Sequence, residues 1–248
     1  MDYLEMLAKL GVGNAHPGGY SATLAQLEQW PIPPGVKVLE IGCGTGRTAC
    51  LLAERGCHVT AVDYREDMIA KAIGRAKNQQ SKVQFLQADA RNLPFTNESF
   101  DIVLLESVTL FAGIQKPISE YFRVLKPGGT LYDREMMAMS EASDELLVQV
   151  KELYGFDELP TQDTWQHHFT AAGFGELQCW EPSHFHPDMA AEEEQYPDFS
   201  QRADEDTLLN QELWETASRY HQLMDHFADE LGYGLFIAQK PPRSREKH

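Results

Sequence analysis

This sequence of 248 residues has little basic charge, few cysteines and no long apolar run. It contains 21 Lys and Arg against 38 Asp and Glu, which gives a net charge of -17. A protein that binds nucleic-acid phosphates or an anionic membrane surface needs a basic face, so this balance argues against both partners. No segment approaches the 18 consecutive apolar residues that predict a membrane-spanning helix. The composition therefore predicts neither a nucleic-acid partner nor a membrane partner.

The chain also lacks the features of a secreted protein. Its first ten residues, MDYLEMLAKL, carry acids and have neither the basic nor the apolar region of a signal peptide. The cysteines form no CxxC pair, which argues for reduced thiols rather than a disulfide framework. These cysteines are Cys43, Cys50, Cys57 and Cys179. We expect a cytoplasmic protein.

What is present is enough apolar sequence for a folded core, since 42% of the residues are hydrophobic. From residue 36 to residue 136, short β-branched runs alternate with amphipathic stretches of helical length. The predicted strands are 36–42, 58–64, 82–90, 100–107 and 129–136, and the predicted helices are 46–56, 65–78 and about 114–125. This alternation predicts an α/β fold with a parallel sheet that has helices on both faces.

Acidic charge is concentrated toward the C-terminus. Residues 181–230 contain fourteen acidic and two basic residues, a net charge of -12. Within them, residues 208–231 have apolar side chains at three- and four-residue spacings, which is typical of an amphipathic helix. A predicted helix at 163–174 precedes this segment, and strand-like runs at 175–181 and 232–239 flank it. Two interpretations stay open: a lid over the substrate side of the sheet, or a helix packed on the sheet edge.

These patterns divide the chain into four predicted units. They are an N-terminal helical arm (1–35), a core (36–182 and 231–241), an acidic helical lid insertion (183–230) and a flexible tail (242–248).

A glycine-rich loop, Glu40-Ile-Gly-Cys-Gly-Thr-Gly46, lies where the first predicted strand meets the first predicted helix. Glycines let the backbone turn tightly and let a ligand approach closely. A nicotinamide dinucleotide site would show GxGxxG or GxGxxA here. Counting from Gly42 puts Arg47 in the third glycine position, whereas counting from Gly44 puts Ala49 there. The loop alone therefore leaves a dinucleotide site open.

Acidic residues end the next two predicted strands. Asp63 lies 19 residues after Gly44, where a carboxylate can accept hydrogen bonds from two ribose hydroxyls. A dinucleotide site would use such a residue in the same way. Asp89 lies where a carboxylate can accept a hydrogen bond from the exocyclic amine of adenine. Both residues could instead simply cap helices.

With these features the sequence resembles the class I S-adenosylmethionine (SAM) dependent methyltransferases of the small-molecule type. The matching motifs are VLEIGCGTG, AVD, ADA, LPF…SFDIV and RVLKPGG, in the order and spacing of that family, across residues 36–130. The resemblance implies a Rossmann-like, seven-stranded, mostly parallel sheet and SAM as the cofactor. A nicotinamide-dependent oxidoreductase would leave the later motifs unexplained.

The resemblance also implies which residues contact the methionine part of SAM. The loop glycines Gly42, Gly44 and Gly46 would lie beneath it. Cys43 would contribute its backbone, and Glu40 would lie near the ammonium group.

The same resemblance places the nucleoside of SAM. Asp63 would hold the ribose, and Tyr64 and Met68 would border the adenine. Asp89 and Ala90 would contact the edge of the base.

The catalytic residue stays open, with His16, Tyr20 and Glu106 as candidates. Glu106 lies where the family builds the floor between cofactor and substrate. His16 and Tyr20 belong to Asn14-Ala-His-Pro-Gly-Gly-Tyr20, a segment that its proline and glycines also explain as a plain turn.

The predicted function is methyl transfer from SAM to a small-molecule acceptor. No NPPY or DPPY tetrapeptide follows the fourth predicted strand, where Glu106-Ser-Val-Thr109 stands, and such tetrapeptides mark the family branches that methylate amino groups of nucleic acids. The alternative is a catalytically silent SAM-binding regulator or scaffold. The pair His184 and His186 has no CxxC or HExxH partner, so we expect no metal site.

Overall fold

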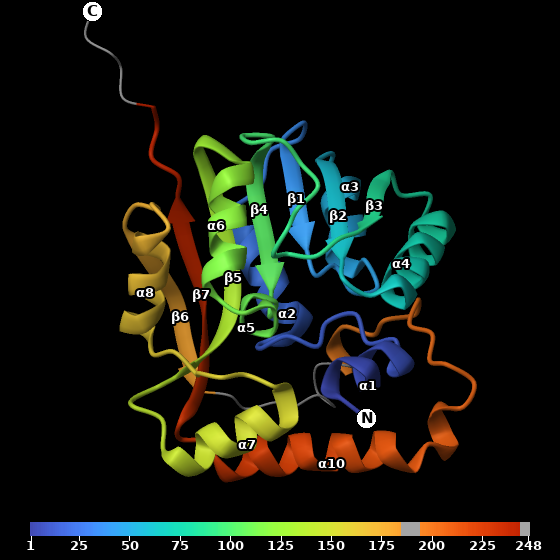
Figure 1. The fold of residues 1–248 in the computed structure, drawn as a ribbon. Coiled ribbons are helices and arrows are strands. Elements are labelled where there is room, and N and C mark those ends of the chain that lie inside the picture. Colours follow the sequence, from blue (N-terminus) through green and yellow to red (C-terminus); the bar gives the residue numbers. More distant parts are fainter. Residues whose placement is uncertain (185–193, 244–248) are drawn as a thin grey trace, which may run out of the picture.

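The computed structural model describes residues 1–184 and 194–243, which contain one seven-stranded sheet in the order β3-β2-β1-β4-β5-β7-β6. The strands are β1 (Lys37–Ile41), β2 (His58–Asp63), β3 (Val83–Gln87), β4 (Phe100–Glu106), β5 (Leu125–Ala138), β6 (Leu177–His184) and β7 (Leu231–Gln239). Strand β7 runs antiparallel to β5 and β6, and the remaining neighbours pair in parallel. The predicted mostly parallel sheet is therefore confirmed (Figure 1).

Helices cover both faces of this sheet. They are α1 (Tyr3–Leu10), α2 (Gly19–Gln29), α3 (Arg47–Glu54), α4 (Glu66–Gln79), α5 (Thr109–Ala112), α6 (Gln115–Val124), α7 (Asp144–Tyr154), α8 (Gln162–Ala171) and α10 (Gln211–His226), with a short 3-10 helix η1 (Thr207–Leu209). None of these helices is both long enough and apolar enough to cross a membrane.

The alternation of side chains along the strands produces two apolar cores. On β1, Leu39 and Ile41 face a core that contains Ile118 of α6 and Trp165 of α8. Val38, pointing the other way, faces a second core, to which α2, α3 and α4 contribute Leu27, Leu52 and Ile69. The sheet is thus buried on both sides, which explains why its strands are continuous apolar runs.

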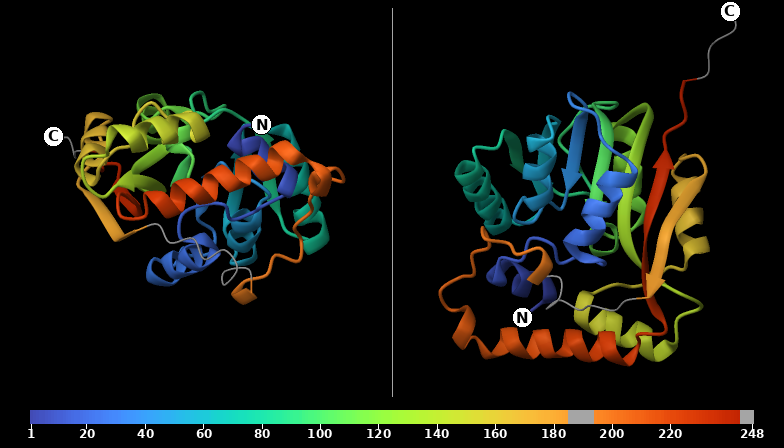
Figure 2. Two further views of the ribbon diagram at one scale, coloured as in Figure 1. Left: turned by 90° about the horizontal axis from the view of Figure 1, so that it is seen from below. Right: turned by 180° about the vertical axis from the view of Figure 1, so that it is seen from behind.

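Three helices lie beyond the carboxyl ends of the parallel strands: α1, α7 and α10 (Figures 1 and 2). Asp2 caps α1 by accepting a hydrogen bond from the backbone N–H of Glu5 at 2.7 Å. The long helix α10 contacts both α1 and α7. Ligands of open α/β sheets bind outside the carboxyl ends of the strands, so these helices surround the expected site.

Several predicted boundaries differ from the structure. Strand β6 continues through Ser183 and His184, which were predicted to belong to the acidic insertion, and α10 is shorter than the predicted helix at 208–231. Helix α7 was not predicted. Residues 185–193 of the acidic insertion and 244–248 of the predicted tail lie outside the described residues, as does His186.

Candidate active site

The glycine loop forms the floor of a cavity of about 330 Å³ at the carboxyl end of β1, which we call the cofactor cavity. Gly42 has φ +71°, and a Cβ atom there would lie 2.2 Å from Cγ2 of Val108, so only glycine fits. Gly44 has φ +51° and no atom within 4 Å of where its Cβ would be, because it faces the open cavity. The loop backbone is therefore exposed to a ligand at Gly44.

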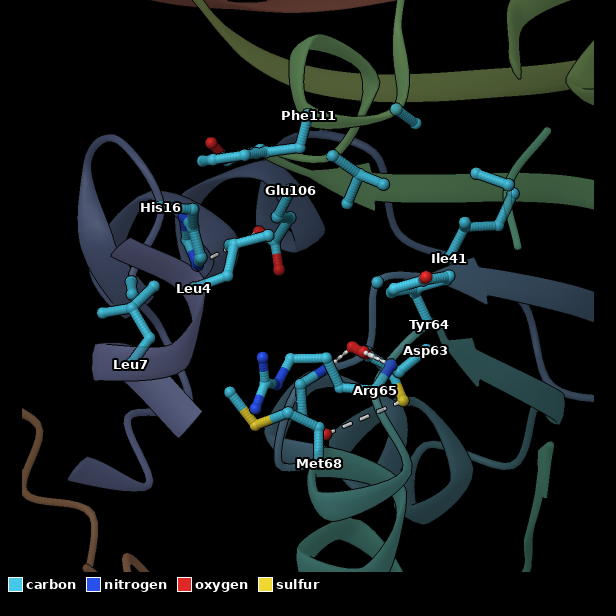
Figure 3. Close-up of a pocket in the computed structure, with 18 of the residues that line it drawn as sticks. Leu4, Leu7, His16, Ile41, Asp63, Tyr64, Arg65, Met68, Glu106 and Phe111 are labelled. Carbon is cyan, nitrogen blue, oxygen red and sulfur yellow. Dashed lines mark hydrogen bonds and ion pairs between the residues drawn. The ribbon is translucent and has the colours of Figure 1, made fainter. Parts of the chain in front are cut away.

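Asp63 ends β2 beside this loop (Figure 3). Its Oδ2 accepts a hydrogen bond from the backbone N–H of Gly44 at 2.8 Å, and its Oδ1 accepts one from Arg65 at 2.9 Å. Burial raises the pKa of Asp63, and the two backbone hydrogen bonds oppose that rise. The carboxylate therefore shapes the glycine loop while it lines the cavity.

Glu40 lies on β1 and lines the same cavity. It is only 4% exposed, and its Oε2 atom has no hydrogen-bond partner among the described residues. Burial raises the pKa of Glu40 well above its ordinary value, and the charges of Glu106 and Asp63 raise it further. A cation or a hydrogen-bond donor bound in the cavity would satisfy a buried carboxylate oxygen of this kind.

Glu106 ends β4 and lies across the cavity from Asp63 (Figure 3). Its Oε1 accepts a hydrogen bond from Oγ1 of Thr23 at 2.5 Å, and its Oε2 accepts one from Oγ1 of Thr48 at 3.1 Å. The Nε2 atom of His16 lies 3.6 Å from Glu106 Oε1, and the Nε atom of Arg134 lies 3.8 Å from it. Residues of the arm and of the core thus meet at this carboxylate.

The far end of the cofactor cavity is lined by Tyr64, Met68, Asp89 and Ala90. The ring of Tyr64 is 66% exposed, whereas Met68 is buried. Asp89 is bound by the guanidinium of Arg91, whose Nη2 lies 2.7 Å from Asp89 Oδ2, and this lowers the pKa of Asp89. Apolar side chains and the Asp89–Arg91 ion pair therefore line this end of the cavity together.

Most predicted site residues meet in this one cavity. Those that line it are His16, Glu40, Gly42, Cys43, Gly44, Asp63, Tyr64, Met68, Asp89, Ala90 and Glu106. Gly46 does not line it; it precedes α3, and a Cβ there would lie 3.0 Å from Cβ of Ala72.

Tyr20, the remaining catalytic candidate, lines neither this cavity nor the one described next. The guanidinium of Arg47 lies 3.7 Å from the centre of the Tyr20 ring, and the ring of Tyr196 meets it edge-on. Tyr20 therefore joins the N-terminal arm to the acidic insertion.

A second cavity of about 410 Å³ adjoins the first, and we call it the acceptor cavity. It is lined by α1, α10, the turn at residues 14–19 and part of the acidic insertion. Sequence reasoning missed the α1 side chains that line both cavities, Tyr3 and Leu7. The apolar face of this short helix was the pattern that could have indicated them.

Metal ligands are not clustered in the described part of the chain. No group of three or more His, Cys, Asp or Glu side chains there could hold an ion.

Comparison with known proteins places this site in a family. A family model described as "Methyltransferase domain" matches residues 38–129. The "Uncharacterized methyltransferase YodH" of Bacillus subtilis (strain 168) is 34% identical over 238 residues, which cover 96% of this chain and 99% of that protein. This chain belongs to the class I SAM-dependent methyltransferase family.

Solved structures agree with the fold of this methyltransferase. Phosphoethanolamine N-methyltransferase 2 of Haemonchus contortus, in complex with SAM, has a TM-score of 0.74 and 23% sequence identity, over 96% of this chain and 57% of that one. The same protein with phosphomonomethylethanolamine and S-adenosylhomocysteine also has a TM-score of 0.74 and 23% identity, over 95% of this chain and 57% of that one. SAM is the cofactor of the family, so this chain is a SAM-dependent enzyme.

Proposed function

We propose that this methyltransferase binds SAM in the cofactor cavity and transfers its methyl group to a small molecule held in the acceptor cavity. The observation that carries the proposal is a set of three of the carboxylates that line the cofactor cavity: Glu40, Asp63 and Glu106. SAM has a positively charged sulfonium and a positively charged ammonium. Carboxylates in a partly enclosed cavity attract both groups more strongly than they would in water.

The residues present fit SAM in detail. Glu40 has a buried oxygen without a partner among the described residues, which the ammonium group would satisfy. Asp63 accepts two backbone hydrogen bonds, and a carboxylate has about four lone-pair sites, so capacity remains for ribose hydroxyls. Gly44 leaves open space for the methionine part. When bound, SAM supplies an electrophilic methyl group, and the chain orients the acceptor toward it.

The nucleoside would occupy the far end of the cavity. Tyr64 and Met68 would border the adenine, and Asp89 with Ala90 would contact its edge. Cys43 would contribute its backbone, because burial raises the pKa of its thiol well above the ordinary value and keeps it un-ionised.

A small-molecule acceptor suits the size and the charge of the site. The acceptor cavity lies beneath α10, a helix within residues 181–230, whose sequence carries a net charge of -12. That charge repels a polyanion such as a nucleic acid. A structural neighbour with this fold was solved in complex with a small molecule, phosphomonomethylethanolamine. The absence of a nucleic-acid partner and a cytoplasmic location stay predictions from composition.

Calorimetric titration with SAM, followed by a screen of metabolites for release of S-adenosylhomocysteine, tests the proposal. We expect SAM to bind, and Glu40→Gln to weaken its binding by roughly tenfold, because a charge-assisted contact is worth about 1.5–3 kcal/mol. Glu54→Gln, on the exposed part of α3, is the matched control and should bind SAM normally. A protein that binds SAM and methylates nothing would instead be the scaffold predicted as the alternative. Absence of SAM binding would refute the assignment of the cavity.

A further inference from the structure

A short segment after β4 contributes to both cavities. It comprises the turn and helix α5, and we call residues 107–112 the junction segment. Its residues that line the cofactor cavity are Ser107, Val108, Phe111 and Ala112. Ser107 and Phe111 also line the acceptor cavity, and Phe111 lies on the same side of the cofactor cavity as Glu106 (Figure 3). The position of this segment therefore shapes both cavities where they meet.

The backbone of the junction segment begins in an unfavourable conformation. Ser107 has φ +62°, in the left-handed region that residues with a side chain rarely adopt. Its N–H donates a hydrogen bond to the carbonyl oxygen of Arg134 on β5 at 2.7 Å. Helix α5 also starts without a cap of its own, because Val108 at the N-cap position has no side-chain oxygen. The segment therefore needs support from outside its own sequence to keep this conformation.

Glu135 of β5 provides this support from the neighbouring strand. Its Oε1 atom accepts hydrogen bonds from the backbone N–H groups of Val108 and Thr109, both at 2.6 Å. The side chain of Glu135 is 0% exposed, so water does not compete for these hydrogen bonds. Without this oxygen, two backbone donors at the start of α5 would lose their acceptor. Glu135 thus does for α5 what a cap residue does from within the chain of a longer helix.

Val108 connects the junction segment to the glycine loop. Its side chain occupies the space in which a side chain on Gly42 would lie. A displacement of the segment would remove this contact from the loop and would also move Ser107 and Phe111, which line both cavities. Glu135 itself lines neither cavity, so any effect that it has on the ligands passes through the junction segment.

On the basis of the proposed function, we propose that Glu135 is a positioning residue of the methyltransferase site: it holds Ser107 in the left-handed conformation and Val108 against Gly42. The length of the side chain matters more than its charge. Burial and the charge of Asp133 raise the pKa of Glu135 well above its ordinary value, which favours the neutral acid. The neutral acid keeps a carbonyl oxygen that accepts both hydrogen bonds.

Three substitutions of Glu135, each measured by calorimetric titration with SAM, test this role. Glu135→Leu removes the acceptor, and Glu135→Asp withdraws it by one methylene group. We expect each to weaken SAM binding at least about tenfold, because two buried N–H groups lose their acceptor when the segment stays in place. Glu135→Gln keeps both the length and a carbonyl oxygen, so its Kd for SAM should stay within about threefold of the wild-type value. The Asp variant gives the same comparison if Glu135→Leu does not fold.

A control separates positioning from a loss of stability alone. Phe169 of α8 is fully buried and lines neither cavity. Phe169→Leu should lower the free energy of unfolding, because it leaves a void in the core, and should keep the wild-type Kd for SAM. An equal loss of SAM affinity in Phe169→Leu and Glu135→Asp would overturn the inference.

Ser107→Gly tests whether Glu135 acts through the conformation of Ser107. Glycine adopts a left-handed conformation without steric cost, so the segment would need less support from Glu135. In the Glu135→Asp background, Ser107→Gly should therefore recover SAM affinity, by at least about threefold relative to its effect in the wild-type background. Equal effects of Ser107→Gly in the two backgrounds would overturn the inference.

The two proposals fail in different ways. Absence of SAM binding by the wild-type protein would refute the proposed function itself. SAM binding that is equally strong in the wild type, Glu135→Leu and Glu135→Asp would leave the proposed function standing and refute the role of Glu135. An equal loss of affinity in Glu135→Gln and Glu135→Leu would refute that role as well.

Discussion

Arg75 of α4 and Asp198 of the acidic insertion form a buried, two-pronged ion pair. Nη1 and Nη2 of Arg75 donate hydrogen bonds to the two oxygens of Asp198 at 2.8 Å and 2.5 Å, and the side chains are 3% and 7% exposed. The same guanidinium donates to the carbonyl oxygen and to Oγ1 of Thr45, at 2.8 Å and 3.0 Å. Thr45 belongs to the glycine loop, and Asp198 lines the acceptor cavity. One side chain therefore links the cofactor loop to the wall of the acceptor cavity.

Replacement of only one partner of this ion pair should destabilise the protein. Arg75→Met or Asp198→Leu alone leaves a buried charge without its partner, and we expect each to destabilise the protein by about 3–5 kcal/mol in urea unfolding. The double variant should recover much of the loss, because it removes both charges. Lys71→Met is the control: its partner Asp204 is 45% exposed, so the loss should stay below about 1 kcal/mol. Additive losses in the double variant would show that the two residues are not coupled.

Hydrogen exchange tests whether the acidic insertion covers the site in a ligand-dependent way. Its described part is attached by Asp198 to Arg75, by Asp204 to Lys71 and by Asp206 to Lys9. We expect backbone amides of residues 194–230 to exchange more slowly when SAM or S-adenosylhomocysteine is bound, because the ligand orders the glycine loop beneath. The strand β4 should change far less. Equal and strong protection of these amides with and without ligand would show that the insertion is a rigid layer, whose order does not depend on the ligand.

The sheet and the cofactor loop could be predicted because local patterns specify them. The apolar run of β1, the glycines after it and Asp63 at the end of β2 each follow from short-range sequence. Helix α7 was missed although local evidence existed: Ser143 caps its start by accepting a hydrogen bond from the N–H of Leu146, and Gly155 ends it with a left-handed conformation.

Long-range contacts could not be read from the sequence. The ring of Tyr20 has the chemistry of a catalytic residue, but its stacking on Arg47 depends on how the arm folds back over the core. The contact of His16 with Glu106 has the same origin, since the two residues are far apart in the chain. No local sequence pattern indicates that the Tyr20 ring stacks on Arg47 whereas His16 contacts Glu106. The packing of the arm against the core decides where each of these side chains lies.

Asp63 should be essential for cofactor affinity. Asp63→Ala removes the acceptor for ribose hydroxyls and also the hydrogen bond that holds the N–H of Gly44. Because each charge-assisted hydrogen bond is worth about 1.5–3 kcal/mol, SAM affinity should fall at least tenfold in calorimetry. Asp101 lies near the start of β4, at the opposite end of that strand from Glu106, and is paired with Lys126. Asp101→Asn is therefore the control and should bind SAM normally. Unchanged affinity of the Asp63 variant would remove this residue from the cofactor site.

Gly44 should tolerate no side chain when SAM is bound. The space around it is open, so Gly44→Val would place its branched side chain in the cofactor cavity and would also strain a backbone with φ +51°. SAM binding should be abolished while circular dichroism still reports a folded protein. Gly74→Ala is the matched control, because this glycine lies within α4 with nothing near its Cβ position. The control should bind SAM normally and be slightly more stable than the wild type.

Two buried carboxyl groups lie side by side on β5, behind the loop after β4. Glu135 accepts hydrogen bonds from the backbone N–H groups of Val108 and Thr109, both at 2.6 Å. Asp133 accepts one from Oγ1 of Thr109 at 2.7 Å, and its Oδ1 atom has no partner among the described residues. Burial raises the pKa of Asp133 to about 7 and raises that of Glu135 well above its ordinary value. The two groups therefore hold the start of α5 in place. The free-energy cost of burying them depends on whether they are protonated.

Asp133 should make the stability of the protein fall as the pH rises. In the folded state its pKa is about 7, whereas in the unfolded chain it returns to the ordinary value of 3.8. Between these two values the folded protein binds more protons than the unfolded chain, so the stabilisation is present below pH 3.8 and is lost as the pH rises through about 7. Asp133→Asn cannot ionise, so the decrease in its free energy of unfolding from pH 5 to pH 8, measured with urea, should be smaller than that of the wild type. Glu152→Gln, an exposed position on α7, is the control and should follow the wild-type curve. Parallel curves for the wild type and the Asp133 variant would mean that this carboxyl group does not ionise between pH 5 and pH 8.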